Sequence, residues 1–232
     1  MRALSRLALA AAACAALLAA GVPAATASPA APPPEPARAA DSAPSTREIM
    51  RRADGLLGAG KTQEAIPLLR QAAAQDPKNP LIQFTLGSAL LQTKDYDGAI
   101  AALQAGLAVA PANLLARKAL AAAQRRKGDL PAARATLEAL WGEAPTFRAA
   151  GEDLAEVLAA QGDRREAIEV YQHLIATYGP TEDTHLARIH TALGRVLEAD
   201  GDRRAALAAY KEALRINPKD GGARAAIQRL SR

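Results

Sequence analysis

Residues 55–62 read GLLGAGKT and fit the spacing G-x-x-x-x-G-K-[ST] of a phosphate-binding loop. Such a loop follows a buried hydrophobic strand, so that its backbone N–H groups and the next helix N-terminus converge on the phosphates. The residues before this motif, TREIMRRAD, are charged and have helical periodicity. No later apolar strand ends in a metal-binding aspartate. We therefore interpret Gly55–Thr62 as a turn between two helices and expect no nucleotide or other cofactor.

The remaining reactive side chains do not form a known catalytic or metal-binding pattern. His185 and His190 are five residues apart, which puts them on different sides of a helix, and no third residue has the spacing of a metal ligand. No Ser/His/Asp arrangement suggests nucleophilic catalysis. We expect the histidines to be structural or surface residues and the protein not to be an enzyme.

The first 27 residues have the features of a secretory signal. Arg2 and Arg6 are positively charged, residues 7–20 are an apolar run of Leu, Ala and one Cys, and residues 25–27 read ATA, a small-residue cleavage site. This pattern predicts a signal peptide over residues 1–27. The mature protein would be periplasmic or secreted and would meet the membrane only during export.

Two alternatives would keep the chain at the membrane. A permanent anchor needs roughly 20 apolar residues, more than the run contains. A lipoprotein would be modified at Cys14, the only cysteine, but the usual large aliphatic residue three positions before it is missing.

Residues 28–45 hold six of the 15 prolines and no large apolar residue, which predicts a flexible, disordered linker.

The composition favours an all-α protein. Alanine occupies 61 of 232 positions and aromatic residues only 3%, which suits closely packed helices better than β-sheets. The formal net charge of +5 falls to +3 without Arg2 and Arg6, and the charges alternate along helical stretches. A basic block is absent, so we do not expect a nucleic-acid partner.

Prolines 77, 111 and 145 are spaced by 34 residues, which indicates a repeat. The repeats are residues 46–79, 80–113, 114–147, 148–186 with an insertion of five residues, and 187–220. Place eight is always small: Ala53, Gly87, Ala121, Ala155 and Gly194. Place 20 is always alanine: Ala65, Ala99, Ala133, Ala167 and Ala206. Place 24 is large: Leu69, Leu103, Leu137, Tyr171 and Tyr210.

This pattern resembles the tetratricopeptide repeat family over residues 46–220. The resemblance implies a right-handed α-solenoid of about five helix pairs, in which small residues let helix A lie close to helix B. Residues 221–232 would form a capping helix. The insertion around residues 181–186 would start the last helix A about one turn earlier, with Thr181 as N-cap, or would form a ledge on the binding surface.

The family's large aromatic residue at place four is missing from every repeat, and Arg52 replaces the usual leucine at place seven of the first repeat. Trp141, at place 28, is expected in the core. These departures concern the packing of individual repeats, whereas the proline spacing supports the array as a whole.

In this family the inner, concave wall is formed by places two, five, nine and twelve of each helix A. We expect an apolar anchor near Phe84 and mixed charges further along, for an extended or helical segment without a terminal carboxylate. The expected groove residues are Leu81, Phe84, Ser88, Leu91, Lys118, Arg125, Glu152, Glu156, Arg188, Arg195 and Glu198.

The resemblance implies a non-catalytic scaffold of the bacterial cell envelope that binds a protein or peptide segment. The alternative is a regulatory or positioning subunit of an envelope enzyme or export complex. The sequence does not identify the partner.

Overall fold

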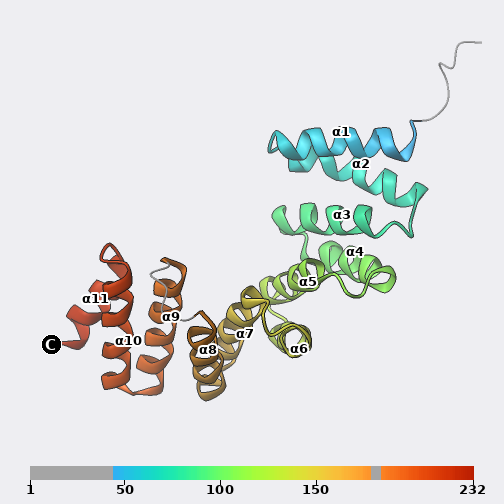
Figure 1. Cartoon of the computed structure of the whole chain (residues 1–232). Helices are drawn as coiled ribbons and strands as arrows, with labels where there is room; N and C mark the ends of the chain where they lie inside the picture. Colours follow the sequence, from blue (N-terminus) through green and yellow to red (C-terminus); the bar gives the residue numbers. More distant parts are fainter. Residues whose placement is uncertain (1–43, 179–183) are drawn as a thin grey trace, which may run out of the picture. The chain divides into compact units, whose positions relative to one another are not determined.

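The computed structural model describes residues 44–178 and 184–232, and the predicted signal peptide lies outside them. Within these residues the chain forms eleven α-helices and no strand (Figure 1). The helices are α1 Thr46–Gly58, α2 Thr62–Gln75, α3 Pro80–Gln92, α4 Tyr96–Val109, α5 Leu114–Lys127, α6 Leu130–Glu143, α7 Arg148–Gln161, α8 Arg164–Tyr178, α9 Thr184–Asp200, α10 Arg203–Ile216 and α11 Gly221–Leu230.

The helices form a solenoid in which each helix packs against the next one in the chain. The odd-numbered helices α1 to α9 are the A helices of five repeats, and the even-numbered helices α2 to α10 are the B helices. Neighbouring A helices also touch, since α5 contacts both α3 and α7. This arrangement is the all-α repeat architecture that the sequence predicts.

Short polar turns separate the two helices of each repeat. Place 15 of every repeat has a positive φ, occupied by glycine in four repeats and by Lys94 in the second. Aspartates follow at Asp95, Asp129 and Asp202, and each accepts a hydrogen bond from a backbone N–H in the first turn of its B helix. The turn therefore ends one helix and caps the next within a few residues.

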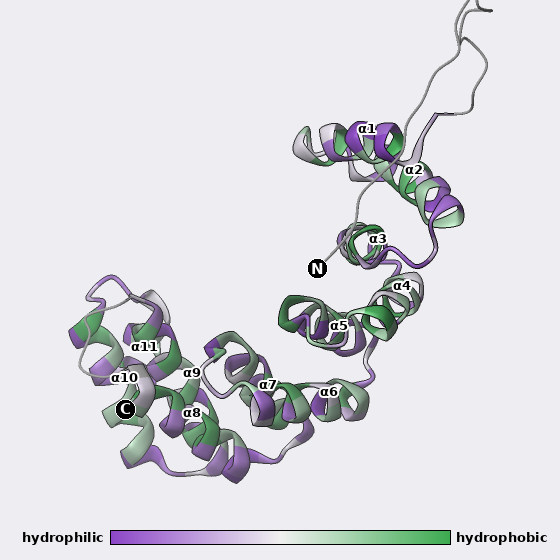
Figure 2. Cartoon of the chain, turned by 45° about the vertical axis from the view of Figure 1, so that its right-hand side comes forward, coloured by the Kyte–Doolittle hydropathy of each residue, from purple (hydrophilic) through white to green (hydrophobic). Residues whose placement is uncertain are grey.

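The core lies between the paired helices, where the repeat places its small residues. The alanines at place 20 are fully buried, and the large residues at place 24 are at most 3% exposed. Gly194 faces Tyr210, because a Cβ atom at Gly194 would lie 2.7 Å from the ring. Figure 2 shows that helices carry both hydrophobic and hydrophilic residues, as expected when one side faces a neighbour.

Helix α9 begins at Thr184, three residues before the repeat frame at Ala187, and is 17 residues long. The insertion thus extends the last A helix at its start. The predicted N-cap Thr181 lies outside the described residues. Helix α11 follows the last repeat, and its buried Ala223 and Ala226 face the array.

None of the helices in the described ranges is long and apolar enough to cross a membrane.

Candidate functional site

The GLLGAGKT segment spans the turn of the first repeat: Gly55–Gly58 form the end of α1, residues 59–61 form the turn, and Thr62 begins α2. Helix α1 occupies the position where a phosphate-binding loop needs a strand, and Gly60 adopts a φ of 74° between α1 and α2. The Lys61 ammonium lies 3.3 Å from the Glu64 carboxylate, and both side chains are more than half exposed. The segment therefore lacks the strand-loop-helix geometry that gathers backbone amides around a phosphate.

The eleven expected groove residues all lie on A helices: four on α3, two on α5, two on α7 and three on α9. We call the surface that these residues form the A-helix face. Its α3 part is apolar and its remaining part is charged, so the two parts are described separately.

The four expected groove residues on α3 differ in how much of each side chain is exposed to a ligand. Leu81 is 66% exposed and Ser88 is exposed, whereas Leu91 is half buried. Phe84 departs from the expectation of a free anchor. Its ring is half buried and packs against Gly106 of α4, next to Leu103. Phe84 therefore contributes to the packing of its own repeat.

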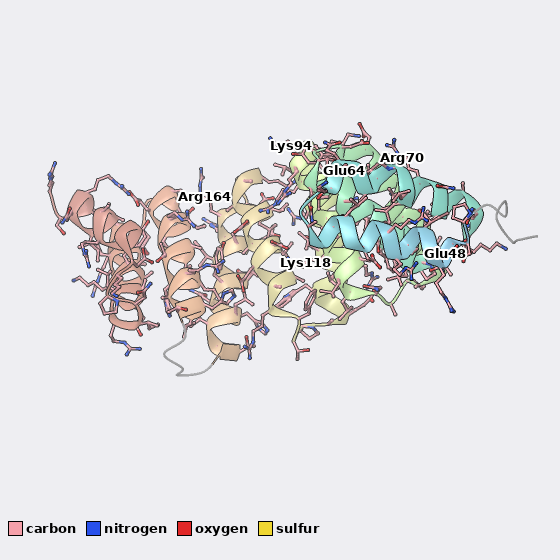
Figure 3. The ribbon with its side chains drawn as sticks, turned by 90° about the horizontal axis from the view of Figure 1, so that it is seen from above. Glu48, Glu64, Arg70, Lys94, Lys118 and Arg164 are labelled. Carbon is pink, nitrogen blue, oxygen red and sulfur yellow. The ribbon has the colours of Figure 1, made fainter. Side chains whose placement is uncertain are left out.

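The charges on α5 and α7 are paired across the repeat boundary. Lys118 (Figure 3) lies 3.1 Å from Asp153, and Arg125 forms an ion pair with Glu156. These pairs join the third repeat to the fourth. Lys118, Arg125 and Glu156, which the sequence suggested as contacts for a ligand, therefore form ion pairs within the chain.

Glu152, the other expected residue of α7, contacts the last A helix. Its Oε1 atom lies 2.6 Å from Nε2 of His185, and Arg188 lies 3.3 Å from the other ring nitrogen of His185.

The second histidine, His190, is half buried, and this burial lowers its pKa. No group of three or more His, Cys, Asp or Glu side chains within the described ranges could hold a metal ion.

Glu198 on α9 is held by Tyr210, which the sequence assigned only to packing at place 24, and by Arg229, which the sequence analysis did not name. The Tyr210 hydroxyl donates to Oε2 of Glu198 over 3.0 Å, and Nη2 of Arg229 lies 2.8 Å from both carboxylate oxygens. The hydrogen bonds from Arg229 and Tyr210 lower the pKa of Glu198. Burial, together with the hydrogen bond to this carboxylate, raises the pKa of Tyr210 to about 12.

Two adjoining depressions lie between α7, α8 and α9, with volumes of about 250 and 430 Å³. Both are lined by Glu156, Tyr171, Ala192 and Arg195. Arg195 is exposed and makes no hydrogen bond or ion pair with a described residue. Burial raises the pKa of Tyr171 to about 12, so its hydroxyl keeps its proton and remains a donor.

The sequence reasoning named Glu156 and Arg195 but missed Tyr171, which it assigned only to packing. The signal was available in the repeat alignment, since place 24 holds leucine in three repeats and tyrosine in two.

Sequence profiles of the tetratricopeptide repeat match residues 56–123 and 146–219, which together make up more than half of the chain. The chain belongs to the tetratricopeptide repeat family. Among curated proteins no relative matches it. Membership of the tetratricopeptide repeat family supports a role as a protein-interaction scaffold, because stacked helix pairs form extended binding surfaces.

Solved structures share this fold at low sequence identity. The solved chain of MamA from Desulfovibrio magneticus RS-1, residues 41 to the end, is 20% identical, with a TM-score of 0.68 over 76% of this chain and 97% of that chain. YrrB, described as a TPR protein with an unusual peptide-binding site, is 16% identical, with a TM-score of 0.66 over 79% of this chain and 92% of YrrB. A kinesin light chain of Podosopora anserina with nearly identical TPR-like repeats is 24% identical, with a TM-score of 0.64 over 75% of this chain and 94% of its own.

Proposed function

We propose that this tetratricopeptide repeat protein is a non-catalytic scaffold of the bacterial cell envelope that binds a segment of a partner protein on its A-helix face. The proposal is carried by the depressions between α7, α8 and α9, since both lie on this face and expose Arg195, which forms no ion pair with a described residue. The exposed Leu81 adds an apolar contact at the other end of the face. Binding sites that combine apolar contacts with a few polar groups are typical of segment recognition.

The envelope location rests on the amino-acid sequence. A charged start, an apolar run and a small-residue cleavage site in residues 1–27 support export. The charged side chains of α5 and α7 hold adjacent repeats together.

Affinity capture with matched variants tests the proposed binding face. The purified protein is immobilised, exposed to a cell-envelope extract of its source organism, and the retained proteins are quantified by mass spectrometry. The test variant combines Leu81→Glu with Ser88→Arg, since both residues are exposed on α3. The control is Val109→Glu, because Val109 is a 51% exposed hydrophobic residue on the B helix α4.

We expect one partner to be retained by the parent and by the Val109→Glu control and to be lost from the A-helix variant. Circular dichroism of each variant verifies that the helices are intact. A partner retained equally by all three proteins would contradict binding at the α3 part of the A-helix face. An enzyme retained at fixed stoichiometry would favour the alternative of a regulatory or positioning subunit.

A further inference from the structure

Adjacent repeats meet at a recurrent pair of positions on the A-helix face, place 12 of one A helix and place nine of the next. Between the third and fourth repeats these positions hold Arg125 and Glu156, which form an ion pair. Between the fifth repeat and α11 they hold Glu198 and Arg229, which also form an ion pair. Between the fourth and fifth repeats they hold Ala159 and Arg195. Arg195 thus faces an alanine where the corresponding Arg229 has a carboxylate.

The tyrosines at place 24 also differ in whether a carboxylate stands at place 12 of the same repeat. Tyr210 donates its hydroxyl hydrogen bond to Glu198, which stands at place 12 of its own repeat. Tyr171 occupies place 24 of the fourth repeat, where place 12 is Ala159, whose methyl group accepts no hydrogen bond. Tyr171 is 3% exposed and makes no hydrogen bond with a described residue. Its hydroxyl oxygen is not among the buried side-chain atoms that lack a partner, so it opens onto the depression that Tyr171 lines and can donate a hydrogen bond to a ligand there.

The depression of about 430 Å³ is the space beside these side chains, and we call it the Tyr171 pocket. Ala159, Ala192 and Val196 supply apolar lining, and Arg164 (Figure 3) and Arg195 supply positive charge. The side chain of Arg164 makes no hydrogen bond or ion pair with a described residue.

Negative charges also border the two depressions, but each already has a partner. Glu156 lines the Tyr171 pocket and pairs with Arg125. In the adjoining depression, Glu152 lies 2.6 Å from His185. Asp220 caps α11, accepting hydrogen bonds from the Ala223 N–H and the Thr191 hydroxyl. The charge of Arg195 helps to lower the pKa of Asp220 across the adjoining depression, although the two form no ion pair. The Tyr171 pocket itself is lined by the paired Glu156 and by two arginines, Arg164 and Arg195, that form no ion pair with a described residue, so its unmatched charge is positive.

We propose that the Tyr171 pocket binds the carboxylate of a glutamate side chain in the partner segment. This carboxylate would accept from the Tyr171 hydroxyl and pair with Arg195, as Glu198 does with Tyr210 and Arg229 within the chain. The methylene groups of the glutamate would lie against the alanines and Val196. The proposal rests on the proposed function and names the chemistry of the segment: it is acidic and has small apolar residues beside the glutamate.

Capped peptides test this chemistry without knowledge of the natural partner. The probes are acetylated and amidated peptides Leu-Ala-Xaa-Ala-Leu in which Xaa is Glu, Gln or Lys, so that the neighbours of Xaa are small and none of these probes has a terminal carboxylate. A fourth probe is the Gln peptide with a free C-terminus. Binding to the purified protein is followed by NMR through the arginine side-chain N–H groups and the backbone amides of α7 and α9.

We expect the Glu peptide to shift the Arg195 resonances and to bind at least tenfold tighter than the capped Gln and Lys peptides. Equal affinity of the Glu and Gln peptides, or shifts confined to other helices, would overturn the assignment. Tighter binding of the Gln peptide with the free C-terminus would replace the glutamate side chain by a terminal carboxylate and would also overturn it.

Substitutions provide the second arm of the test. Ala159→Glu places a carboxylate at place 12 of the fourth repeat, the place that Glu198 occupies in the fifth. This carboxylate should bond to Tyr171 and Arg195 and occupy the pocket, so the melting temperature should rise and the Glu peptide should no longer bind. Arg195→Gln should abolish the preference for Glu over Gln. Arg204→Gln is the matched control, because Arg204 is an exposed arginine on α10 outside the Tyr171 pocket. Unchanged peptide binding by Ala159→Glu would contradict the proposal.

A pair of tyrosine substitutions separates ligand binding from structural stabilisation. Tyr171→Phe should weaken binding of the Glu peptide about tenfold with an unchanged melting temperature, since its hydroxyl has no partner within the described chain. Tyr210→Phe should lower the melting temperature without affecting the peptide. Failure of the pocket assignment can be distinguished from failure of the proposed function. If the captured partner still binds the Arg195→Gln variant but is lost from the α3 variant, the pocket assignment is wrong and the proposed function stands.

Discussion

The close approach of the two helices in a repeat predicts opposite effects for the same substitution at two glycines. At Gly194 a Cβ atom would lie 2.7 Å and 2.8 Å from two ring carbons of Tyr210. Tyr210 is 1% exposed and is hydrogen-bonded to Glu198, so its ring cannot move away without losing packing or that bond. At Gly55, in the last turn of α1, a Cβ atom would meet nothing within 4 Å.

The magnitudes follow from two general effects. Replacing a helical glycine by alanine stabilises the helix by about 0.5–1 kcal/mol, because alanine has less conformational freedom to lose. Inserting a methyl group into a tightly packed interface costs about 1–3 kcal/mol. Gly55→Ala gains only the first effect, so we expect it to stabilise by about 0.5–1 kcal/mol. Gly194→Ala combines both effects, so the cost of the added methyl group exceeds the helix gain and the net destabilisation should be about 1 kcal/mol, and at most about 2.5 kcal/mol.

Urea denaturation followed by circular dichroism measures both changes, and equal m-values for the variants and the parent show that the free energies are comparable. The opposite signs are the decisive result. A Gly194→Ala variant at least as stable as the parent would refute the view that the Tyr210 ring needs glycine opposite it to pack at this distance.

Three further predictions concern the turns and the N-terminus. Gly162→Ala should cost about 1 kcal/mol because φ is 92°, whereas Lys94→Gly should stabilise by roughly 0.5 kcal/mol because φ is 66°; equal denaturation midpoints would contradict this. Lys61→Ala should change stability by less than about 0.5 kcal/mol, and a micromolar affinity for ATP that this variant loses would show that the turn interpretation is wrong. Mass spectrometry of the exported fraction should find an N-terminus at Ser28, and an intact Met1 there would disprove cleavage.

The fold was predictable because its main determinants recur in the sequence. The alanine at place 20 is fully buried in every repeat, and the residue at place 24 is always buried beside it. These positions pack within one helix pair, so a single repeat contains the information needed to place them. The same reasoning placed GLLGAGKT in a turn, since the other repeats have polar turns at that position.

The groove was less predictable because a side chain at a groove position can contact a ligand, the next repeat or its own repeat. Phe84 is at an expected groove position, yet Gly106 of α4 leaves room for its ring within the repeat. Lys118 and Arg125 find carboxylates about one repeat further along the chain, at Asp153 and Glu156. Such pairings depend on the orientation of long side chains, which the repeat pattern of one sequence does not fix.

The most direct test of the central claim is site-specific photo-crosslinking in living cells of the source organism. A photoreactive residue replaces either Ser88, exposed on the A helix α3, or Gln104, exposed on the B helix α4 of the same repeat. Binding of a partner segment along the A-helix face predicts a discrete crosslinked partner from position 88 and none from position 104. A partner crosslinked from position 104 and absent from position 88 would contradict it.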